Sequence, residues 1–267
     1  MELDWWVVYL AIGAVVGFMA GLLGIGGGML MVPVLVLVFG AQGLAPEHLM
    51  HVSLATALAT IAFTSISSVR AHHLHGSVDW RIARIMAPGI LTGAFFASFG
   101  AGAIPTWPLA AIFTALLFYA SAQMLIEIKP SASRALPGTL GIFVAGSVIG
   151  VVSSLLAAGG AFLTIPFLTW CQVPVRRAIG TAAANGFPIA IAGTAGYVVQ
   201  GLRSQGLPAG SLGYVYLPAL FLIVGVSVLT APLGARVAHR LPVRQLRRVF
   251  AVVMFLLGLR MLAGLWR

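Results

Sequence analysis

Carboxylates are scarce in this chain of 267 residues, which has only five acidic side chains. They are Glu2, Asp4, Glu47, Asp79 and Glu127, and each lies near a terminus, in a predicted loop or at the end of an apolar segment. No apolar segment therefore carries a carboxylate at its centre. This argues against a proton relay of intramembrane carboxylates and against a carrier of hard cations.

Cysteine and charge are also nearly absent. The single Cys171 excludes an internal disulfide and a metal site built from several thiolates. Charged residues make up 7% of the chain, whereas an ordinary soluble domain has about 25%. Hydrophobic residues make up 60%, and a soluble fold of this size could not cover them with so few polar side chains. The chain is therefore predicted to be an integral membrane protein.

The charges that are present are mostly basic, with 15 Lys and Arg against five acids and a net charge of +10. In a soluble protein this excess would suggest nucleic-acid binding. In a membrane protein it matches the excess of basic residues in cytoplasmic loops. We therefore expect the lipid bilayer, and no nucleic acid, as a partner.

Eight apolar segments follow one another along the chain, and two of them are too long for a single span. The segments are 5–39, 51–69, 85–102, 107–126, 139–171, 179–200, 214–235 and 249–265. A straight helix of about 35 residues would measure about 50 Å, against a hydrocarbon core of about 30 Å. Glycine-rich stretches interrupt both long segments near their middle, at 24–28 and at 157–161.

The two interrupted segments are copies of one motif. When residues 13–35 are compared with 146–168, ten of 23 pairs are identical, including four glycines and one proline. We therefore predict two homologous halves, 1–128 and 138–267. The polar segment 129–137 would join them as a cytoplasmic linker.

The loop charges predict how the halves are oriented. Loop 70–84 carries three arginines and its counterpart 201–213 carries one, whereas loop 40–50 has no basic residue and its counterpart 172–178 has two. By the positive-inside rule, equivalent loops lie on opposite faces of the membrane. Inversion needs an odd number of crossings per half, so each long segment must enter and leave on one face. The predicted fold is an all-α polytopic membrane protein of two inverted repeats, each a glycine-broken re-entrant helical hairpin plus three transmembrane helices.

The glycine breaks suggest an anion site. A glycine tip leaves main-chain N–H groups open at the start of the second limb, where the helix dipole is positive, and such a helix terminus binds anions without a buried cation. The candidate ligands are Gly24, Gly26, Gly27, Gly28, Gly159 and Gly160. The alternative for any of these glycines is close helix packing, which we favour for Gly13, Gly17 and Gly21.

Four neutral side chains that follow the hairpins are further candidates for substrate binding. Ser53 and Thr56 share one helix face, and Thr181 and Asn185 share another, because each pair is three or four residues apart. Neutral donors suit a substrate that must be bound and then released. Hydrogen bonding between helices of the bundle is an equally good alternative.

Two other groups of polar residues give weaker signals. His72, His73 and His75 lack the spacing of a helical metal-ligand pair, so we expect a solvated cytoplasmic loop and no metal site. Arg260 lies inside the last apolar segment, and its long side chain is expected to reach the interface. A role for it in a substrate pathway is the alternative.

The glycine motif resembles that of a known family. Gly17, Gly21, Gly24, Gly26–Gly28 and Pro33, echoed from Gly150 to Pro166, look like the signature of the TauE/SafE sulfite-exporter family. The resemblance covers the whole chain, although Ser154, Ala157 and Ala161 replace glycines in the second copy. It implies a multi-pass permease of the bacterial inner membrane for a small sulfur-containing anion such as sulfite, thiosulfate or a C2 organosulfonate.

The expected function is a secondary transporter, working as an exporter by alternating access and needing no cofactor. The alternatives are an anion channel of the same architecture and a non-transport membrane protein such as an assembly factor. No enzyme is expected, because the sequence has no HExxH pair, no GxSxG elbow and no carboxylate pair within the membrane segments.

Overall fold

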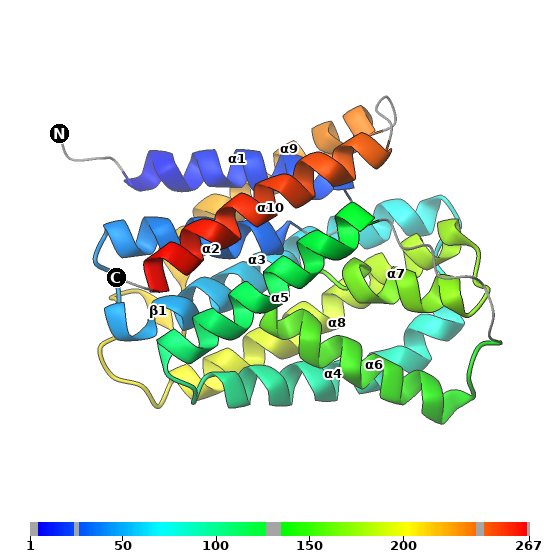
Figure 1. Ribbon diagram of the computed structural model, residues 1–267, viewed down its shortest axis with the longest axis horizontal. Helices are drawn as coiled ribbons and strands as arrows, with labels where there is room; N and C mark the ends of the chain where they lie inside the picture. Colours follow the sequence, from blue (N-terminus) through cyan, green and yellow to red (C-terminus); the bar gives the residue numbers. More distant parts are fainter. Residues whose placement is uncertain (1–4, 24–26, 127–134, 239–242, 266–267) are drawn as a thin grey trace.

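The computed structural model describes residues 5–23, 27–126, 135–238 and 243–265. These residues form long helices that run roughly along one axis of an elongated bundle (Figure 1). In chain order the elements are α1 (Trp5–Leu23), α2 (Gly28–Ala41), the 3-10 turn η1 (Pro46–His48), α3 (Leu49–Leu74), α4 (Trp80–Ala101), α5 (Thr106–Ile126), α6 (Thr139–Leu155), α7 (Ala161–Trp170), α8 (Val175–Gly201), β1 (Ser211–Leu212), β2 (Val215–Tyr216), α9 (Leu217–Ala238) and α10 (Val243–Leu265).

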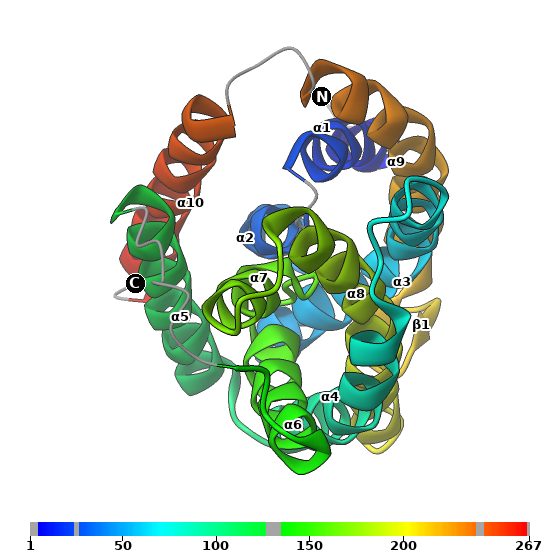
Figure 2. The ribbon, with the colours of Figure 1, turned by 90° about the vertical axis from the view of Figure 1, so that its right-hand side faces the viewer.

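The chain is an all-α multi-pass membrane protein. Among the described residues, five helices are long and apolar enough to cross a bilayer, namely α3 with η1, α4, α5, α8 and α9. Their outward faces carry many large apolar side chains, as lipid contact requires. The spans α3 and α8 are the most buried of the five. Viewed from the end, α2 and α7 lie in the middle of the bundle, with α5 and α10 on one side and α9 on the other (Figure 2).

Both long apolar segments are broken at the predicted glycines. The first becomes α1 and α2, and the second becomes α6 and α7. The residue before each second limb is a glycine in the left-handed region, Gly27 with φ 64° and Gly160 with φ 80°. A side chain is strained in this conformation, which explains glycine at both places. Within each pair the two helices run in opposite directions (Figure 1).

The first helix of each broken segment packs on a helix that is not its neighbour in the chain. Helix α1 packs along α9, and α6 packs along α4. Small residues make this possible, because a Cβ added at Gly13 would lie 2.7 Å from a main-chain oxygen of α9 and one added at Gly146 would lie 2.6 Å from one of α4. Gly17 and Gly21 on α1 meet α9 in the same way. The packing interpretation of these α1 glycines therefore agrees with the structure.

The two ends of the bundle differ in charge. The arginine-rich end, where α3 ends and α4 and α8 begin, carries exposed Arg70, Arg81, Arg84, Arg176 and Arg177. The opposite end holds 42–48, 102–105 and 202–216, and Arg203 is its one basic loop residue among those described. The elements at each end are joined by contacts such as the hydrogen bond from the Arg176 guanidinium to the His75 carbonyl oxygen.

Two loops differ from expectation. The predicted loop 70–84 is mostly helix, because α3 continues to Leu74 and α4 begins at Trp80. Helix α3 extends beyond the apolar segment 51–69, because polar residues can stay helical once the chain has left the membrane core. The loop 201–213 contributes to a short antiparallel hairpin in which Ser211 pairs with Tyr216 and Leu212 with Val215. That hairpin was not predicted.

Candidate functional site

The tips of the two broken segments touch near the centre of the bundle. A Cβ added at Gly28 would lie 2.2 Å from the carbonyl oxygen of Ala157 and 2.4 Å from Cδ1 of Ile61. The first turn of α2 is therefore in contact with the turn between α6 and α7, and only glycine allows this approach. Gly24 and Gly26 were also predicted as ligands, but they lie outside the described residues.

Both second limbs begin with open main-chain N–H groups. Their N-cap residues are Gly27 and Gly160, which offer no side-chain acceptor to the first turn. The carbonyl oxygen of Gly27 accepts from Leu30 and Met31, and that of Gly160 accepts from Thr164. The N–H groups of the residues before these are those that a helix start leaves without an intrahelical partner. Each limb thus presents a partial positive charge at its tip.

The second tip is held tightly against α8. A Cβ added at Gly186 would lie 2.8 Å from the carbonyl oxygen of Gly159. At Gly160, an added Cβ would lie 3.0 Å from Cδ1 of Ile189 and 3.1 Å from the carbonyl oxygen of Ala182. The tip and one face of α8 therefore form a single rigid unit.

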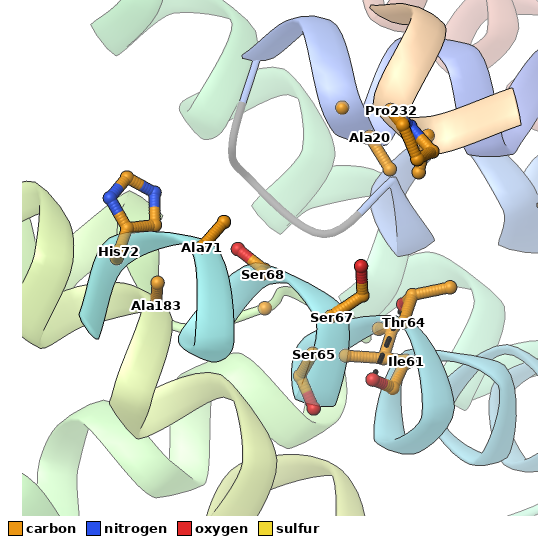
Figure 3. Close-up of a pocket in the computed structure, with 13 residues that line it drawn as sticks. Ala20, Ile61, Thr64, Ser65, Ser67, Ser68, Ala71, His72, Ala183 and Pro232 are labelled. Carbon is orange, nitrogen blue, oxygen red and sulfur yellow. Dashed lines mark hydrogen bonds between the residues drawn. The ribbon is translucent and has the colours of Figure 1, made fainter. Parts of the chain in front are cut away.

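A cavity of about 280 Å³ runs along α3 from the tips toward the arginine-rich end. Its lining residues are Ala20, Gly21, Ile61, Thr64, Ser65, Ser67, Ser68, Ala71, His72, Gly159, Ala183, Ala231 and Pro232. Ser67 and Ser68 extend from α3 toward the side where Ala20 and Pro232 lie, whereas Ser65 points the other way (Figure 3). Gly159 brings the second tip to this space.

The hydroxyl groups of the cavity were not among the predicted ligands. Thr64 and Ser65 donate to main-chain carbonyls of their own helix, whereas Ser67 and Ser68 have no hydrogen bond to any described residue. A signal for them existed in the polar run 64–68, which ends an otherwise apolar segment. From the sequence alone, a turn of hydroxyl side chains at the end of an apolar segment indicates the start of a loop. Only the positions of the neighbouring helices show that these hydroxyls line a cavity.

Two of the predicted residues, Thr56 and Thr181, make similar hydrogen bonds. Thr56 Oγ1 accepts from the N–H of Tyr216 at 3.1 Å, directly before α9. Thr181 Oγ1 accepts from the N–H of Asp79 at 3.0 Å, directly before α4. Both are fully buried. These bonds agree with the alternative that Thr56 and Thr181 hold elements of the bundle together. Ser53 also has a structural partner, because its hydroxyl donates to the carbonyl of Leu49 in its own helix.

Asn185 differs from these residues, because its buried side-chain amide has a hydrogen-bond partner on only one of its two polar atoms. Its Nδ2 lies 3.5 Å from Sδ of Met86, a weak acceptor, and its Oδ1 has no partner in the described structure. Several buried hydroxyls that the sequence did not single out also lack a partner, among them Ser153 on α6 and Thr164 on α7, whereas Thr194, Tyr197 and Ser211 lie further from the tips along the chain. Unpaired buried polar atoms are costly, so Ser153, Thr164 and Asn185 are candidates for contact with a ligand.

The histidines and Arg260 lie away from the tips. His72 lines the cavity, and its Nδ1 is 3.3 Å from Ser77 Oγ. His73 accepts from Trp80 Nε1, and His75 Nδ1 is 2.7 Å from the carbonyl of Ala71. No group of three or more His, Cys, Asp or Glu residues within the described ranges could hold a metal ion. Arg260 is exposed on α10, as expected of a side chain that reaches the interface.

Aromatic side chains close the opposite end of the bundle. The ring of Tyr216 packs edge-on against Phe39 and Tyr9, with centroids 5.7 Å and 6.5 Å away. The ring of Tyr214 stacks on His51 at 4.9 Å. These residues come from α1, α2, α3 and the β hairpin, so the closure joins both halves of the chain. The cavity and the closure lie at opposite ends.

Comparison with known proteins places the chain among membrane transporters. The family model described as sulfite exporter TauE/SafE matches residues 9–261. A probable membrane transporter protein of Haemophilus influenzae is 36% identical over 253 residues, which cover 94% of this chain and 96% of the relative. A probable membrane transporter protein of Methanocaldococcus jannaschii is 24% identical over 257 residues, with 94% and 93% covered. No solved structure matches the chain.

Proposed function

We propose that this chain, which belongs to the sulfite exporter TauE/SafE family, is a secondary transporter of a small sulfur-containing anion. Sulfite, thiosulfate and C2 organosulfonates are the expected classes. Export is the expected direction, because a membrane potential that is negative inside drives an anion out with about 2.3 kcal/mol per charge for each 100 mV. Such an exporter needs no coupling ion and no cofactor, and we propose no catalytic activity.

The contact between the two tips is the observation that carries this proposal. Gly28, the first residue of α2, is in main-chain contact with Ala157 in the turn between α6 and α7, so the positive start of α2 lies beside the turn that leads into α7. Anions bind at such starts through main-chain N–H groups and the helix dipole. Transporters with broken helices place their substrates at the same kind of site. In this proposal Gly24, Gly26, Gly27, Gly28, Gly159 and Gly160 form the anion cradle.

We further propose the inverted-repeat topology, with repeats 1–128 and 138–267 joined by the linker 129–137. The reciprocal packing of α1 on α9 and α6 on α4 supports it, and so do the matching bonds of Thr56 and Thr181. Each glycine-broken pair would then be a re-entrant hairpin. The positive-inside rule assigns the arginine-rich end to the cytoplasm of the bacterial inner membrane.

Alternating access follows from this orientation. The cavity reaches from the second tip to His72 at the arginine-rich end, so this conformation would receive the anion from the cytoplasm. The aromatic closure blocks the opposite end. Release outward would require the rings of Tyr216 and Tyr214 to separate from Phe39 and His51. Thr56 and Thr181, which fasten the chain before α9 and α4, would guide the movement of the halves rather than bind the anion.

An anion channel of the same architecture is the second candidate. The closure at one end and the cavity at the other favour a carrier, because a channel needs one continuous pore. Purified protein in proteoliposomes distinguishes them. We expect saturable flux of sulfite or a C2 sulfonate, accelerated by the same anion on the other side. Flux that rises linearly without such counterflow would indicate a channel, and no flux of any sulfur anion by folded protein would refute transport.

A further inference from the structure

The two tips differ in their polar surroundings, although their main chains are alike. Five buried side-chain atoms on α6, α7 and α8 have no partner, and three of them are close in the chain to the second tip or to Gly186: Ser153 Oγ, Thr164 Oγ1 and Asn185 Oδ1. The other two, Thr194 Oγ1 and Tyr197 Oη, lie further along α8. Ser153 lies four residues before Ala157, and Thr164 lies four residues after Gly160. Asn185 directly precedes Gly186, which is in contact with Gly159. Each of α6, α7 and α8 therefore carries one unsatisfied buried polar group close to the second tip along the chain.

The first tip has no such set. The repeat that aligns 13–35 with 146–168 places Ala20 opposite Ser153 and Met31 opposite Thr164. If Thr56 is aligned with Thr181 because of their similar bonds, Asn185, four residues after Thr181, is aligned with Thr60, four residues after Thr56. The hydroxyl of Thr60 donates to the carbonyl of Thr56 at 2.9 Å, so it is not unpaired. At these matching positions the first tip thus has no unpaired buried side chain, whereas the second has three.

No cationic side chain accompanies these donors. No Lys or Arg whose side chain the structure describes is buried, and none lines the described cavity. The positive charge at the tips therefore comes from the starts of α2 and α7, each equivalent to about half an elementary charge. Together they balance about one negative charge. A second negative charge would be buried without compensation, which is strongly unfavourable.

We propose that the second tip selects the substrate by its charge and takes a singly charged sulfur oxyanion group, RSO₃⁻ or HSO₃⁻, in preference to a dianion. Its oxygens accept hydrogen bonds from Ser153, Thr164 and the amide of Asn185, whose oxygen and nitrogen can exchange places by rotation. This inference rests on the proposed transport function and narrows it. Bisulfite and monosulfonates are carried, and sulfate, thiosulfate and the sulfite dianion are not.

Proteoliposome flux under a fixed membrane potential tests the charge selection. We expect one charge to move with each methanesulfonate or 2-hydroxyethanesulfonate, and no flux of sulfate or thiosulfate. Sulfite flux should fall as the pH rises, because bisulfite loses its proton. Methanesulfonate stays singly charged, so its flux controls for titration of the protein itself, including His72 in the cavity.

The outcomes separate this inference from the proposed function. If no sulfur anion moves, the transport function fails. If thiosulfate or sulfate moves as fast as methanesulfonate and carries two charges, transport stands but the charge selection is wrong. Sulfite flux that does not change with pH while methanesulfonate is carried would also overturn it.

Substitutions test the placement at the second tip. Thr164→Val keeps the shape of the side chain but removes the hydroxyl, so the KM for methanesulfonate should rise roughly 10- to 100-fold, as for loss of a hydrogen bond to a charged group. Thr164→Ser should restore it. Thr114→Val is the matched control, since this buried hydroxyl donates only to its own helix. If Thr164→Val folds, as its thermal unfolding midpoint would show, and has an unchanged KM, the anion does not bind at the second tip.

Discussion

Substitution of Gly28 by alanine tests whether the contact between the tips is required. The added Cβ would lie 2.2 Å from the carbonyl oxygen of Ala157, about 1.2 Å inside the 3.4 Å at which ordinary contact begins. Neither partner can yield easily. Gly28 begins a helix, and the carbonyl oxygen that it faces belongs to the main chain of Ala157, which lies in a tight turn with φ 47°. Overpacking of this kind costs about 1–3 kcal/mol, which would either destabilise the fold or separate the tips.

If this cost falls on the arrangement of the tips, Gly28→Ala should lower anion flux about 5- to 150-fold, since 1.4 kcal/mol corresponds to a factor of ten. Gly225→Ala on α9 is the matched control, because its added Cβ would meet nothing within 4 Å. Flux into proteoliposomes and the thermal unfolding midpoint in detergent should be measured for both. Wild-type flux and stability in Gly28→Ala would refute the requirement for tip contact.

Two further predictions concern stability and topology. Thr56→Val and Thr181→Val should each destabilise the protein by about 1–3 kcal/mol, because each leaves a main-chain N–H without its acceptor; thermal unfolding in detergent measures this, and an unchanged midpoint would show that the bonds are dispensable. The exposed positions Glu47, Gln205 and His75 report orientation when each is replaced by cysteine. A membrane-impermeant maleimide added to intact cells should label Glu47→Cys and Gln205→Cys but reach His75→Cys only after lysis, and labelling of all three in intact cells would contradict the inverted topology.

The helix breaks were predictable because glycine leaves a strong local signal. The stretches 24–28 and 157–161 interrupt segments too long for one span, and Gly27 and Gly160 adopt the left-handed conformation that glycine allows. The all-α membrane class was also predictable, because it follows from the amino-acid composition and does not depend on which helices contact one another.

The roles of the polar side chains were not predictable, because they depend on neighbours that are distant in the sequence. Thr56 is satisfied by a residue 160 positions away and Thr181 by one 102 positions away. Ser153 and Thr164 look like ordinary small residues of apolar helices, and only the finished packing shows that their hydroxyls lack partners. Spacing on one helix gives the face on which a side chain lies, but not what that face meets.

The packing of α1 on α9 has a consequence for biogenesis. Gly13 packs against α9, and the hydroxyl of Thr230 approaches the Gly13 carbonyl from 217 positions further along the chain. Helix α1 is therefore synthesised well before α9, the helix that covers its glycine face. During that interval the glycine face of α1 lacks the partner it has in the folded protein. A chain that stopped before α9 would leave this face uncovered, so the packing of α1 depends on a helix far along the chain.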